Sequence, residues 1–126
     1  MNKTLIVDFD GVLHWYREGW KDGSIYDEPV PGARQAMEEL IEIGYKIVIF
    51  STRAFDRTVK GVFEPSQKGE MIDWLNRYQI PCHDIWQEHG KPMGHAYLDD
   101  RAIQFRGNWR ESIQSIQTFK AWSTQY

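Results

Sequence analysis

Two aspartates, Asp8 and Asp10, stand one residue apart in the run LIVDFDGVLH, which spans residues 5–14. A buried strand normally excludes carboxylates, because an unpaired charge is costly to remove from water. Residues i and i+2 of a strand share one face, so both carboxylates can project together where the strand ends. They either form a turn before Gly11, since Asp-Gly is a common turn pair, or hold a ligand.

Other polar residues follow apolar runs in the same way. Ser51 ends the run KIVIFS, and Asp99 and Asp100 end the run AYLDD. Lys91 lies in the loop before that second run. Each has an ordinary alternative, because a serine can simply end a strand, a loop lysine is usually solvated, and Asp100 can pair with Arg101. The ordered set, with two acidic pairs at strand ends, nevertheless favours a functional site over chance placement.

The segments that would position these residues alternate between strand-like runs and helical periodicity. Apolar runs without alternation are typical of strands whose two faces are both covered. Strands are expected at residues 4–7, 46–51, 83–87 and 95–99, with an edge strand at 102–105. A polar loop is expected at residues 52–65.

Three helices are expected where apolar residues recur at helical spacing. The first lies at residues 33–43, with Pro31 in its first turn and Gly44 at its exit. Ser66 is expected to cap the second helix, and Asn108 with Glu111 the third. The inward-facing residues are expected to be Ala33, Ala36, Met37, Leu40 and Ile41, then Met71, Ile72, Leu75 and Tyr78, then Ile113, Ile116 and Phe119.

Strands that alternate with helices indicate a parallel sheet with helices on both faces. The expected fold class is therefore α/β, a Rossmann-like three-layer sandwich with a mainly parallel sheet. In such sheets ligands bind beyond the carboxyl ends of the strands. Asp8, Asp10, Ser51, Lys91, Asp99 and Asp100 should gather at that edge.

Composition limits the other possibilities. The 126 residues fit a single domain, 1–126, and the net charge of −3 gives no overall attraction to nucleic acid or to anionic membranes. Cys82 is the one cysteine, and we interpret it as a small buried residue rather than a nucleophile. An internal disulfide is excluded, and no apolar stretch is long enough to span a bilayer. We expect a cytoplasmic protein without a membrane partner.

Taken together, the motifs resemble those of the haloacid dehalogenase superfamily of aspartate-nucleophile phosphohydrolases. Asp8 and Asp10, followed by Gly11, match its first motif, an apolar strand that ends in Asp-x-Asp. Ser51 matches the second motif, Lys91-Pro92 the third and AYLDD the fourth. The resemblance covers residues 4 to 105 and implies a fold of the same type.

The resemblance also implies roles for the motif residues. Asp8 attacks phosphorus and forms an aspartyl-phosphate, which divides one difficult step into two. Asp10 protonates the leaving oxygen and then deprotonates the hydrolytic water. Ser51 binds a phosphoryl oxygen, and Lys91 neutralises charge and orients Asp8.

The cofactor that the resemblance implies is Mg²⁺. A carboxylate nucleophile needs a cation, because the phosphoryl group that it attacks is already negative. Asp8, the main-chain carbonyl of Asp10 and Asp99 would be ligands of the metal. Asp100 would either bind the metal or lie close behind its ligands.

Many members of this superfamily carry a cap domain, for which this chain has little room. Residues 14–29 can form only a short flap, and residues 87–91 almost nothing. An open site suits a phosphate group on a large substrate, or a neighbouring subunit that excludes water. In the flap, Trp15, Tyr16 and Trp20 either stack on a substrate or pack against the body of the protein.

A narrower similarity concerns the substrate. STR at Ser51, Thr52 and Arg53, together with LDDR, resembles the phosphatase domain of phage polynucleotide kinase. This resemblance implies that Thr52 and Arg53 contribute to substrate binding and that the substrate is a nucleic acid end with a 3′-phosphate. Arg57 and Lys60 add a local basic cluster, although charged loops are usually just solvated.

The sequence therefore predicts a Mg²⁺-dependent phosphatase whose phosphorylated substrate is a small molecule or a nucleic acid end. One alternative is a polynucleotide 3′-phosphatase. The other is a module that binds phosphorylated ligands without catalysis, although pure binding does not need both Asp8 and Asp10.

Overall fold

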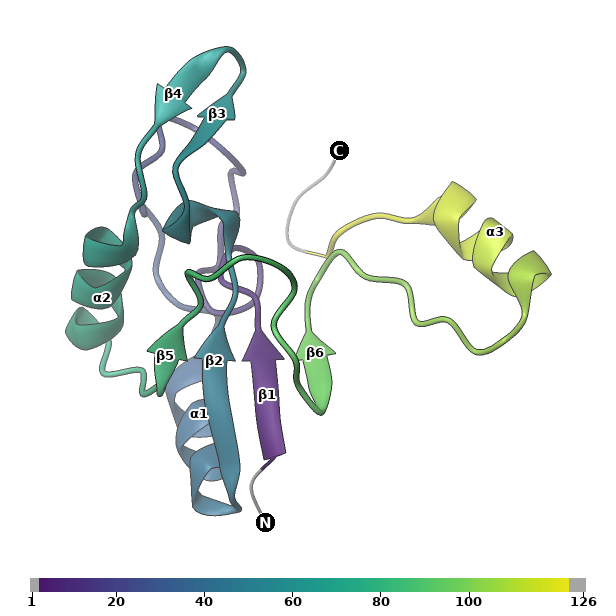
Figure 1. The fold of residues 1–126 in the computed structure, drawn as a ribbon, viewed down its shortest axis with the longest axis horizontal. Helices are drawn as coiled ribbons and strands as arrows, with labels where there is room; N and C mark the ends of the chain where they lie inside the picture. Colours follow the sequence, from purple (N-terminus) through teal and green to yellow (C-terminus); the bar gives the residue numbers. More distant parts are fainter. Residues whose placement is uncertain (1–2, 123–126) are drawn as a thin grey trace.

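The computed structural model describes residues 3–122, and its main sheet has four parallel strands in the order β5–β2–β1–β6 (Figure 1). The strands are β1 (Lys3–Val7), β2 (Tyr45–Ile49), β5 (Asp84–Ile85) and β6 (Ala96–Leu98). The predicted α/β class with a parallel sheet is confirmed. Three strands are shorter than predicted, so Ser51 and Asp99 lie just beyond their strands.

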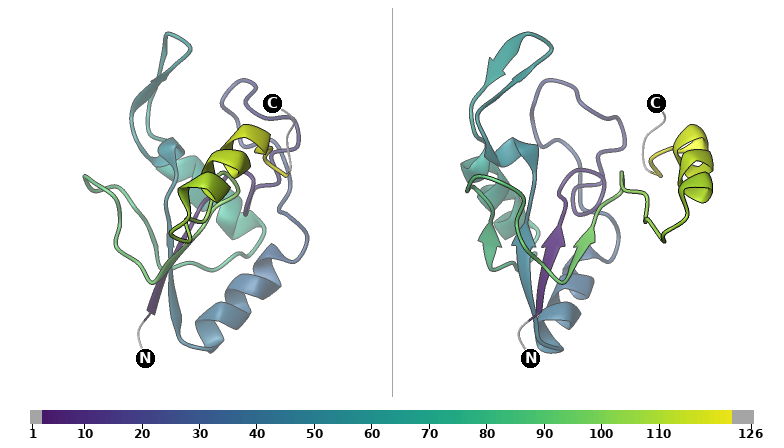
Figure 2. Two further views of the ribbon diagram at one scale, coloured as in Figure 1. Left: turned by 90° about the vertical axis from the view of Figure 1, so that its right-hand side faces the viewer. Right: turned by 45° about the vertical axis from the view of Figure 1, so that its right-hand side comes forward.

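Helices α1 (Ala33–Glu42) and α2 (Lys68–Arg77) cover the same face of the sheet, as the left panel of Figure 2 shows. They lie in the crossovers from β1 to β2 and from β2 to β5, which advance across the sheet in one direction. Right-handed crossovers in one direction place their helices on one face. The core of this layer contains Val7, Ile47, Ile49 and Ile85 from the strands and Met37, Met71, Trp74 and Leu75 from the helices.

A loop, and not a helix, covers the other face. Residues 86–95 connect β5 to β6 at the other end of the sheet order. This connection runs back across the sheet, in the direction opposite to the first two crossovers, and therefore passes over the opposite face. Pro92 is buried there, and a Cβ added at Gly94 would lie 2.6 Å from Cγ1 of Ile6. The backbone of this loop thus rests directly on β1. The predicted helix on the second face is absent from the described residues.

Helix α3 (Trp109–Thr118) lies apart from the sheet (Figure 1). Its predicted cap is confirmed, because the backbone N–H of Glu111 donates to Oδ1 of Asn108 at 3.1 Å. The predicted edge strand at 102–105 is wrong, since this segment has no regular structure and leads the chain away from β6.

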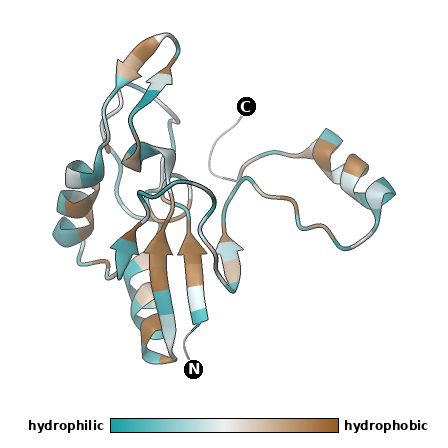
Figure 3. Cartoon of the chain, in the orientation of Figure 1, coloured by the Kyte–Doolittle hydropathy of each residue, from teal (hydrophilic) through white to brown (hydrophobic). Residues whose placement is uncertain are grey.

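Several residues that were predicted to face inward are exposed. Ile113, Ile116 and Phe119 of the α3 region are exposed, Ile116 by 61%. Figure 3 shows apolar bands on this isolated helix. Ala36 and Ile72 are exposed as well. Periodicity identifies the apolar stripe of a helix, but it does not determine which surface the stripe meets.

The ends of α1 and α2 follow the predicted signals with small shifts. Gly44 has a φ of 109°, the left-handed conformation that often ends a helix. Pro31 precedes the N-cap residue Gly32 instead of lying in the first turn. Ser66 lies one residue before the N-cap Gln67. No helix of the described part of the chain is long and apolar enough to cross a membrane.

The expected polar loop at 52–65 is folded. It contains a short 3₁₀ helix (Thr52–Ala54) and an antiparallel hairpin of β3 (Arg57–Val59) and β4 (Val62–Glu64). Lys60 and Gly61 form the turn with φ angles of 51° and 79°. Such turns usually carry Asn-Gly or Asp-Gly, so the Lys-Gly pair is only a weak sequence signal for this hairpin. The hairpin projects beyond the carboxyl ends of the strands (Figure 1).

The flap at residues 14–29 is closed at its base. The backbone N–H of Trp15 donates to the carbonyl of Glu28 at 3.0 Å. Inside the flap, Nη2 of Arg17 lies 2.8 Å from Oδ1 of the buried Asp27. The flap and the β3–β4 hairpin both rise beyond the carboxyl ends of the strands (Figure 2).

Candidate functional site

Six of the predicted site residues, Thr52 among them, meet in one cleft beyond the carboxyl ends of the parallel strands. The cleft has a volume of about 340 Å³, and Asp8, Asp10, Ser51, Asp99 and Asp100 line it. They follow β1, β2 and β6, so the sheet itself brings them together. The other lining residues are Tyr16, Trp20, Phe50, Thr52, Arg57 and Arg101.

Three of these carboxylates form a compact cluster. One oxygen each of Asp8, Asp99 and Asp100 lies within 4.8 Å of the others. Burial, helped by the charge of Asp99, raises the pKa of Asp8 to about 8, although the N–H of Phe9 donates to Asp8 Oδ1 at 2.8 Å and opposes the rise. Burial also raises the pKa of Asp100. So many like charges at one point favour either a bound proton or a cation.

The surroundings of Asp100 fit a cation. Its Oδ1 is buried and has no hydrogen-bond partner among the described residues. A Cβ added at Gly11 would lie only 2.1 Å from Oδ2 of Asp100, so the carboxylate packs directly on the glycine backbone. Carboxylate oxygens are the donors that hard divalent cations such as Mg²⁺ prefer. The donor set of Asp8, Asp99 and Asp100 therefore suits such an ion.

Asp10 is held in place by two side chains. Nε of Arg53 lies 2.8 Å from Oδ2 and 3.0 Å from Oδ1 of Asp10. Nδ1 of His14 lies 2.8 Å from Oδ1. The other ring nitrogen of His14 accepts a hydrogen bond from the backbone N–H of Asp27, so Nδ1 carries the proton and donates to Asp10.

The geometry of Arg53 corrects its predicted role in substrate binding. The side chain is 1% exposed and does not line the cleft. Its Nη1 donates to the carbonyl of Gly23 at 2.8 Å and to Oε1 of Gln67 at 3.0 Å. Arg53 thus joins the flap and the start of α2 to Asp10, and it positions that carboxylate from behind.

His14 is a site residue that the sequence analysis missed. It is fully buried, and its ring packs against those of Phe9 and Trp74 with centroids 5.6 Å away in each case. No local pattern marks a histidine four residues after an aspartate as its partner in a loop. The two residues come together only in the folded chain, where their backbones form an isolated β-bridge.

Ser51 and Thr52 both line the cleft, Ser51 buried and Thr52 exposed. Ser51 caps the 3₁₀ helix, since its Oγ accepts a hydrogen bond from the N–H of Arg53 at 3.2 Å. Its hydroxyl hydrogen remains able to donate to an oxygen in the cleft. Thr52 Oγ1 accepts a hydrogen bond from Nη1 of Arg57 at 2.6 Å.

Arg57 brings a positive charge from the hairpin to the cleft. Its guanidinium carbon lies 4.8 Å from the ring centroid of Trp20. Its Nη2 is buried and has no hydrogen-bond partner among the described residues. Burial and the nearby charge of Arg53 lower the pKa of Arg57. This donor is suited to an anionic oxygen.

Two of the three flap aromatics line the cleft, and the third packs within the flap. Trp15 packs under the guanidinium of Arg17, 4.1 Å from ring centroid to carbon. Tyr16 and Trp20 line the cleft. These two rings therefore face the space that a substrate would enter.

Lys91 is not brought into the cleft. It is exposed and does not belong to the cleft lining. Its Nζ lies 4.5 Å from the ring centroid of Tyr97. The role that the resemblance gives to Lys91 would require its side chain to leave this ring and reach Asp8.

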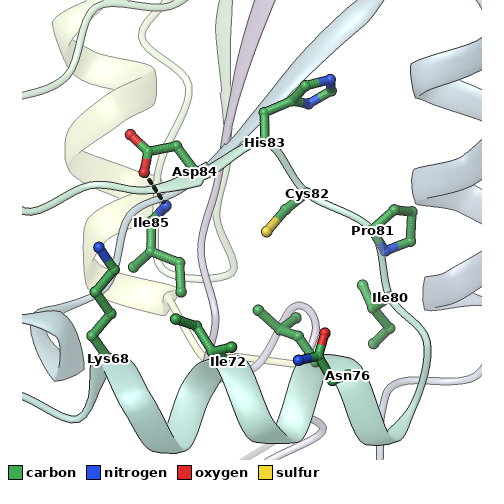
Figure 4. Close-up of a pocket in the computed structure, with 10 residues that line it drawn as sticks. Lys68, Ile72, Asn76, Ile80, Pro81, Cys82, His83, Asp84 and Ile85 are labelled. Carbon is green, nitrogen blue, oxygen red and sulfur yellow. Dashed lines mark hydrogen bonds between the residues drawn. The ribbon is translucent and has the colours of Figure 1, made fainter.

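A second hollow, between α2 and β5, is separate from the cleft. It has a volume of about 300 Å³, and Figure 4 shows the sulfur of Cys82 pointing into it, with Ile72 and Asn76 on the opposite side. Burial raises the pKa of the Cys82 thiol, which disfavours the nucleophilic thiolate. The interpretation of Cys82 as a packing residue agrees with this, although the residue is only half-buried.

Comparisons with known proteins give one likeness in structure. The chain is similar to a crystal structure of a structural-genomics target from Vibrio cholerae, with 26% identity, a TM-score of 0.50 and coverage of 94% of this chain and 99% of that chain. No protein-family model matches the chain, and no curated protein does. The likeness supports an α/β fold of this size.

Proposed function

We propose that this chain is a Mg²⁺-dependent phosphatase of the haloacid dehalogenase type. The observation that supports this most strongly is the gathering of Asp8, Asp99 and Asp100 beside Ser51 at the carboxyl edge of the sheet. A fourth carboxylate, Asp10, lines the same cleft, and hydrogen bonds from Arg53 and His14 hold it apart from this cluster. A nucleophile next to a separate proton donor is what hydrolysis requires and simple binding does not.

In this proposal Asp8 and Asp10 divide the chemistry. An oxygen of Asp8 forms a bond to phosphorus while the bond to the leaving oxygen breaks, and Asp10 gives that oxygen a proton. Water then attacks the phosphorus of the aspartyl-phosphate, its proton goes to Asp10, and phosphate leaves. Arg53 and His14 keep the Asp10 carboxylate in one orientation for both proton transfers.

The remaining polar groups of the cleft would bind the phosphoryl oxygens. Ser51 donates its hydroxyl hydrogen, and Arg57 and Arg101 contribute positive charge. Asp8, Asp99 and Asp100 would hold Mg²⁺. The ion, when bound, reduces the repulsion between a carboxylate nucleophile and the phosphoryl group.

The test is phosphate release from a generic aryl phosphate by the purified chain with Mg²⁺. We expect turnover that excess chelator stops and added Mg²⁺ restores. Asp8→Asn should abolish turnover and keep the circular dichroism spectrum of the wild type, because the amide has the same shape but cannot attack phosphorus. Beryllofluoride, a mimic of the phosphoryl group, should bind to Asp8. Activity of Asp8→Asn near that of wild type would rule out the covalent mechanism.

A module that binds phosphorylated ligands without catalysis makes a different prediction. Wild type and Asp8→Asn would then both bind inorganic phosphate in the presence of Mg²⁺, and neither would turn over any phosphate ester. Isothermal titration with phosphate, run beside the activity assay, separates the two functions.

One observation favours a polynucleotide 3′-phosphatase as a second candidate. Arg57 and two aromatic residues, Tyr16 and Trp20, line the cleft, where a nucleic acid end would meet both a cation and stacking surfaces. An oligonucleotide with a 3′-phosphate should then show a higher kcat/KM than an aryl phosphate. This advantage should fall with added salt, because protein contacts with the phosphate backbone of the oligonucleotide release counterions. An advantage that is absent or independent of salt would exclude this substrate.

A further inference from the structure

A groove opens beside the catalytic cleft, separate from the hollow between α2 and β5. It lies between the β3–β4 hairpin and residues 88–90, and its volume is about 700 Å³, twice that of the cleft. Its walls include the apolar side chains of Phe50, Phe55 and Val59. The proposed reaction uses none of these three residues.

The groove and the cleft are continuous. Phe50, Thr52 and Arg57 line both of them. Any molecule whose phosphoryl group lies beside Asp8 and whose remaining part extends past Thr52 therefore enters this groove. A phosphatase needs such a space for the part of the substrate that carries the leaving oxygen.

The charges of the groove favour an anion. Arg57 and Lys60 contribute two positive charges, His89 adds an imidazole, and Glu88 is the single carboxylate in the lining. At the junction with the cleft, the buried Nη2 of Arg57 lacks a hydrogen-bond partner among the described residues. Lys60 is exposed at the hairpin turn, so its ammonium group is accessible to a ligand.

We propose that this groove binds the leaving group of the substrate, and that this group has an apolar, planar body and a second anionic substituent. The inference rests on the proposed phosphatase function and adds the substrate class to it. The apolar walls take the body, Arg57 lies at the junction, and Lys60 pairs with the second anion. The preferred substrates are therefore phosphate monoesters with two separate negative groups.

The test uses two probes with the same apolar body. They are 2-naphthyl phosphate and the same compound with a sulfonate at position 6 of the ring. We expect kcat/KM of the wild type to be about two- to fivefold higher for the sulfonated probe, the upper part of the range for one exposed ion pair. The ratio should approach one at high salt, because exposed charges are screened.

Substitution of the hairpin lysine assigns the preference to the groove. Lys60→Glu should reduce the ratio of the two kcat/KM values to one or below, and Lys60→Gln should give an intermediate value. The matched control is Lys46→Glu, a charge reversal at an exposed position of β2, which should keep the ratio of the wild type. Thermal unfolding of all variants checks that each is folded.

A binding measurement separates this inference from the proposed function. Asp8→Asn, which should hold the probes without turning them over, is titrated with both compounds, with and without Lys60→Glu. A tighter Kd for the sulfonated probe that disappears with Lys60→Glu supports the groove, even if the wild type releases no phosphate and the phosphatase proposal fails. Equal kcat/KM and equal Kd for the two probes would overturn the groove assignment while leaving phosphatase activity in place.

Discussion

The imidazole of His14 joins the side chain of Asp10 to the backbone of the flap. Its Nδ1 donates to Oδ1 of Asp10 at 2.8 Å, and its Nε2 accepts from the N–H of Asp27 at 3.0 Å. Because a backbone N–H can only donate, this second bond fixes the tautomer of the ring. His14 therefore couples the conformation of the flap to the orientation of the proposed general acid.

Two isosteric substitutions separate the two bonds of His14. Asparagine can place its amide N–H near Nδ1, and glutamine can place its carbonyl near Nε2. We expect His14→Gln to lower kcat at least tenfold with a smaller change in KM, because Asp10 loses a positioning donor. His14→Asn should keep more activity but lose about 1–3 kcal/mol of stability, the cost of an unsatisfied buried N–H. Steady-state kinetics and urea unfolding measure the two effects, and equal kcat losses would contradict the positioning role.

Arg53 and Arg57 should respond to substitution in opposite ways. Arg53 is 1% exposed and paired with Asp10, so Arg53→Met should cost about 3–5 kcal/mol of stability, as expected when a buried ion pair loses one partner. Arg57→Met should change stability much less and lower kcat/KM, because its guanidinium faces the cleft. Chemical denaturation and kinetics on both variants check this. Equal stabilities for the two variants would contradict the buried role of Arg53.

Only part of this site could be predicted from the sequence. The meeting of Asp8, Ser51 and Asp99 could be predicted, because parallel strands present their carboxyl ends at one edge. The burial of Arg53 could not, since it depends on the carbonyl of Gly23 and the amide of Gln67, which only the folded flap and α2 bring to it.

Helix packing shows the same limit. The periodicity around Met37 and Met71 predicted α1 and α2 and the centres of their buried sides, because both helices return directly to a neighbouring strand. Ala36 and Ile72, which were also predicted to face inward, are exposed. The same reasoning on Ile113 and Ile116 predicted a helix correctly but not its surroundings. The loop that covers Ile6 has no periodic signal, so the sequence could not indicate that it replaces a helix.

The acidic cluster predicts how the stability of the metal-free protein depends on pH. The pKa of Asp8 is raised to about 8 when folded, against about 3.9 in an unfolded chain, so between these values the folded state binds a proton that the unfolded state does not. Stability should therefore fall as pH rises from about 4 to 8. Melting temperatures in chelator should show this decline for wild type and for Asp73→Asn, an exposed control, and a flatter profile for Asp8→Asn. A stability that rises over this range would contradict it.

Metal binding should reverse that loss of stability. A ligand that binds only the folded state stabilises it by about 2.7 kcal/mol at a hundredfold excess over Kd. Mg²⁺ should therefore raise the melting temperature of the wild type at pH 8, and Asp99→Ala should reduce the effect. Asp100→Ala should reduce the rise in melting temperature less than Asp99→Ala if Asp100 lies behind the metal ligands, and equally if Asp100 is itself a ligand.

Ca²⁺ should bind and inhibit, because its longer, flexible coordination does not enforce octahedral geometry. An unchanged melting temperature in Mg²⁺ would mean that the folded protein does not bind the ion, which would contradict the proposed metal site.

Gly11 offers a test of the packing that holds Asp100. A Cβ at this position would lie 2.1 Å from Oδ2 of Asp100, and φ is +84°. Gly32 has a similar φ of +89° with nothing within 4 Å, so Gly32→Ala carries only the backbone cost of a left-handed L-residue, about 1–2 kcal/mol. We expect Gly11→Ala to lose clearly more stability than Gly32→Ala and also to weaken Mg²⁺ binding, because the displaced carboxylate of Asp100 leaves the cluster. Urea unfolding and Mg²⁺ titration of the two variants give the comparison. If the two alanine variants matched in both measurements, Asp100 would not depend on its contact with Gly11, and the cluster would have to be held by Asp8 and Asp99 alone.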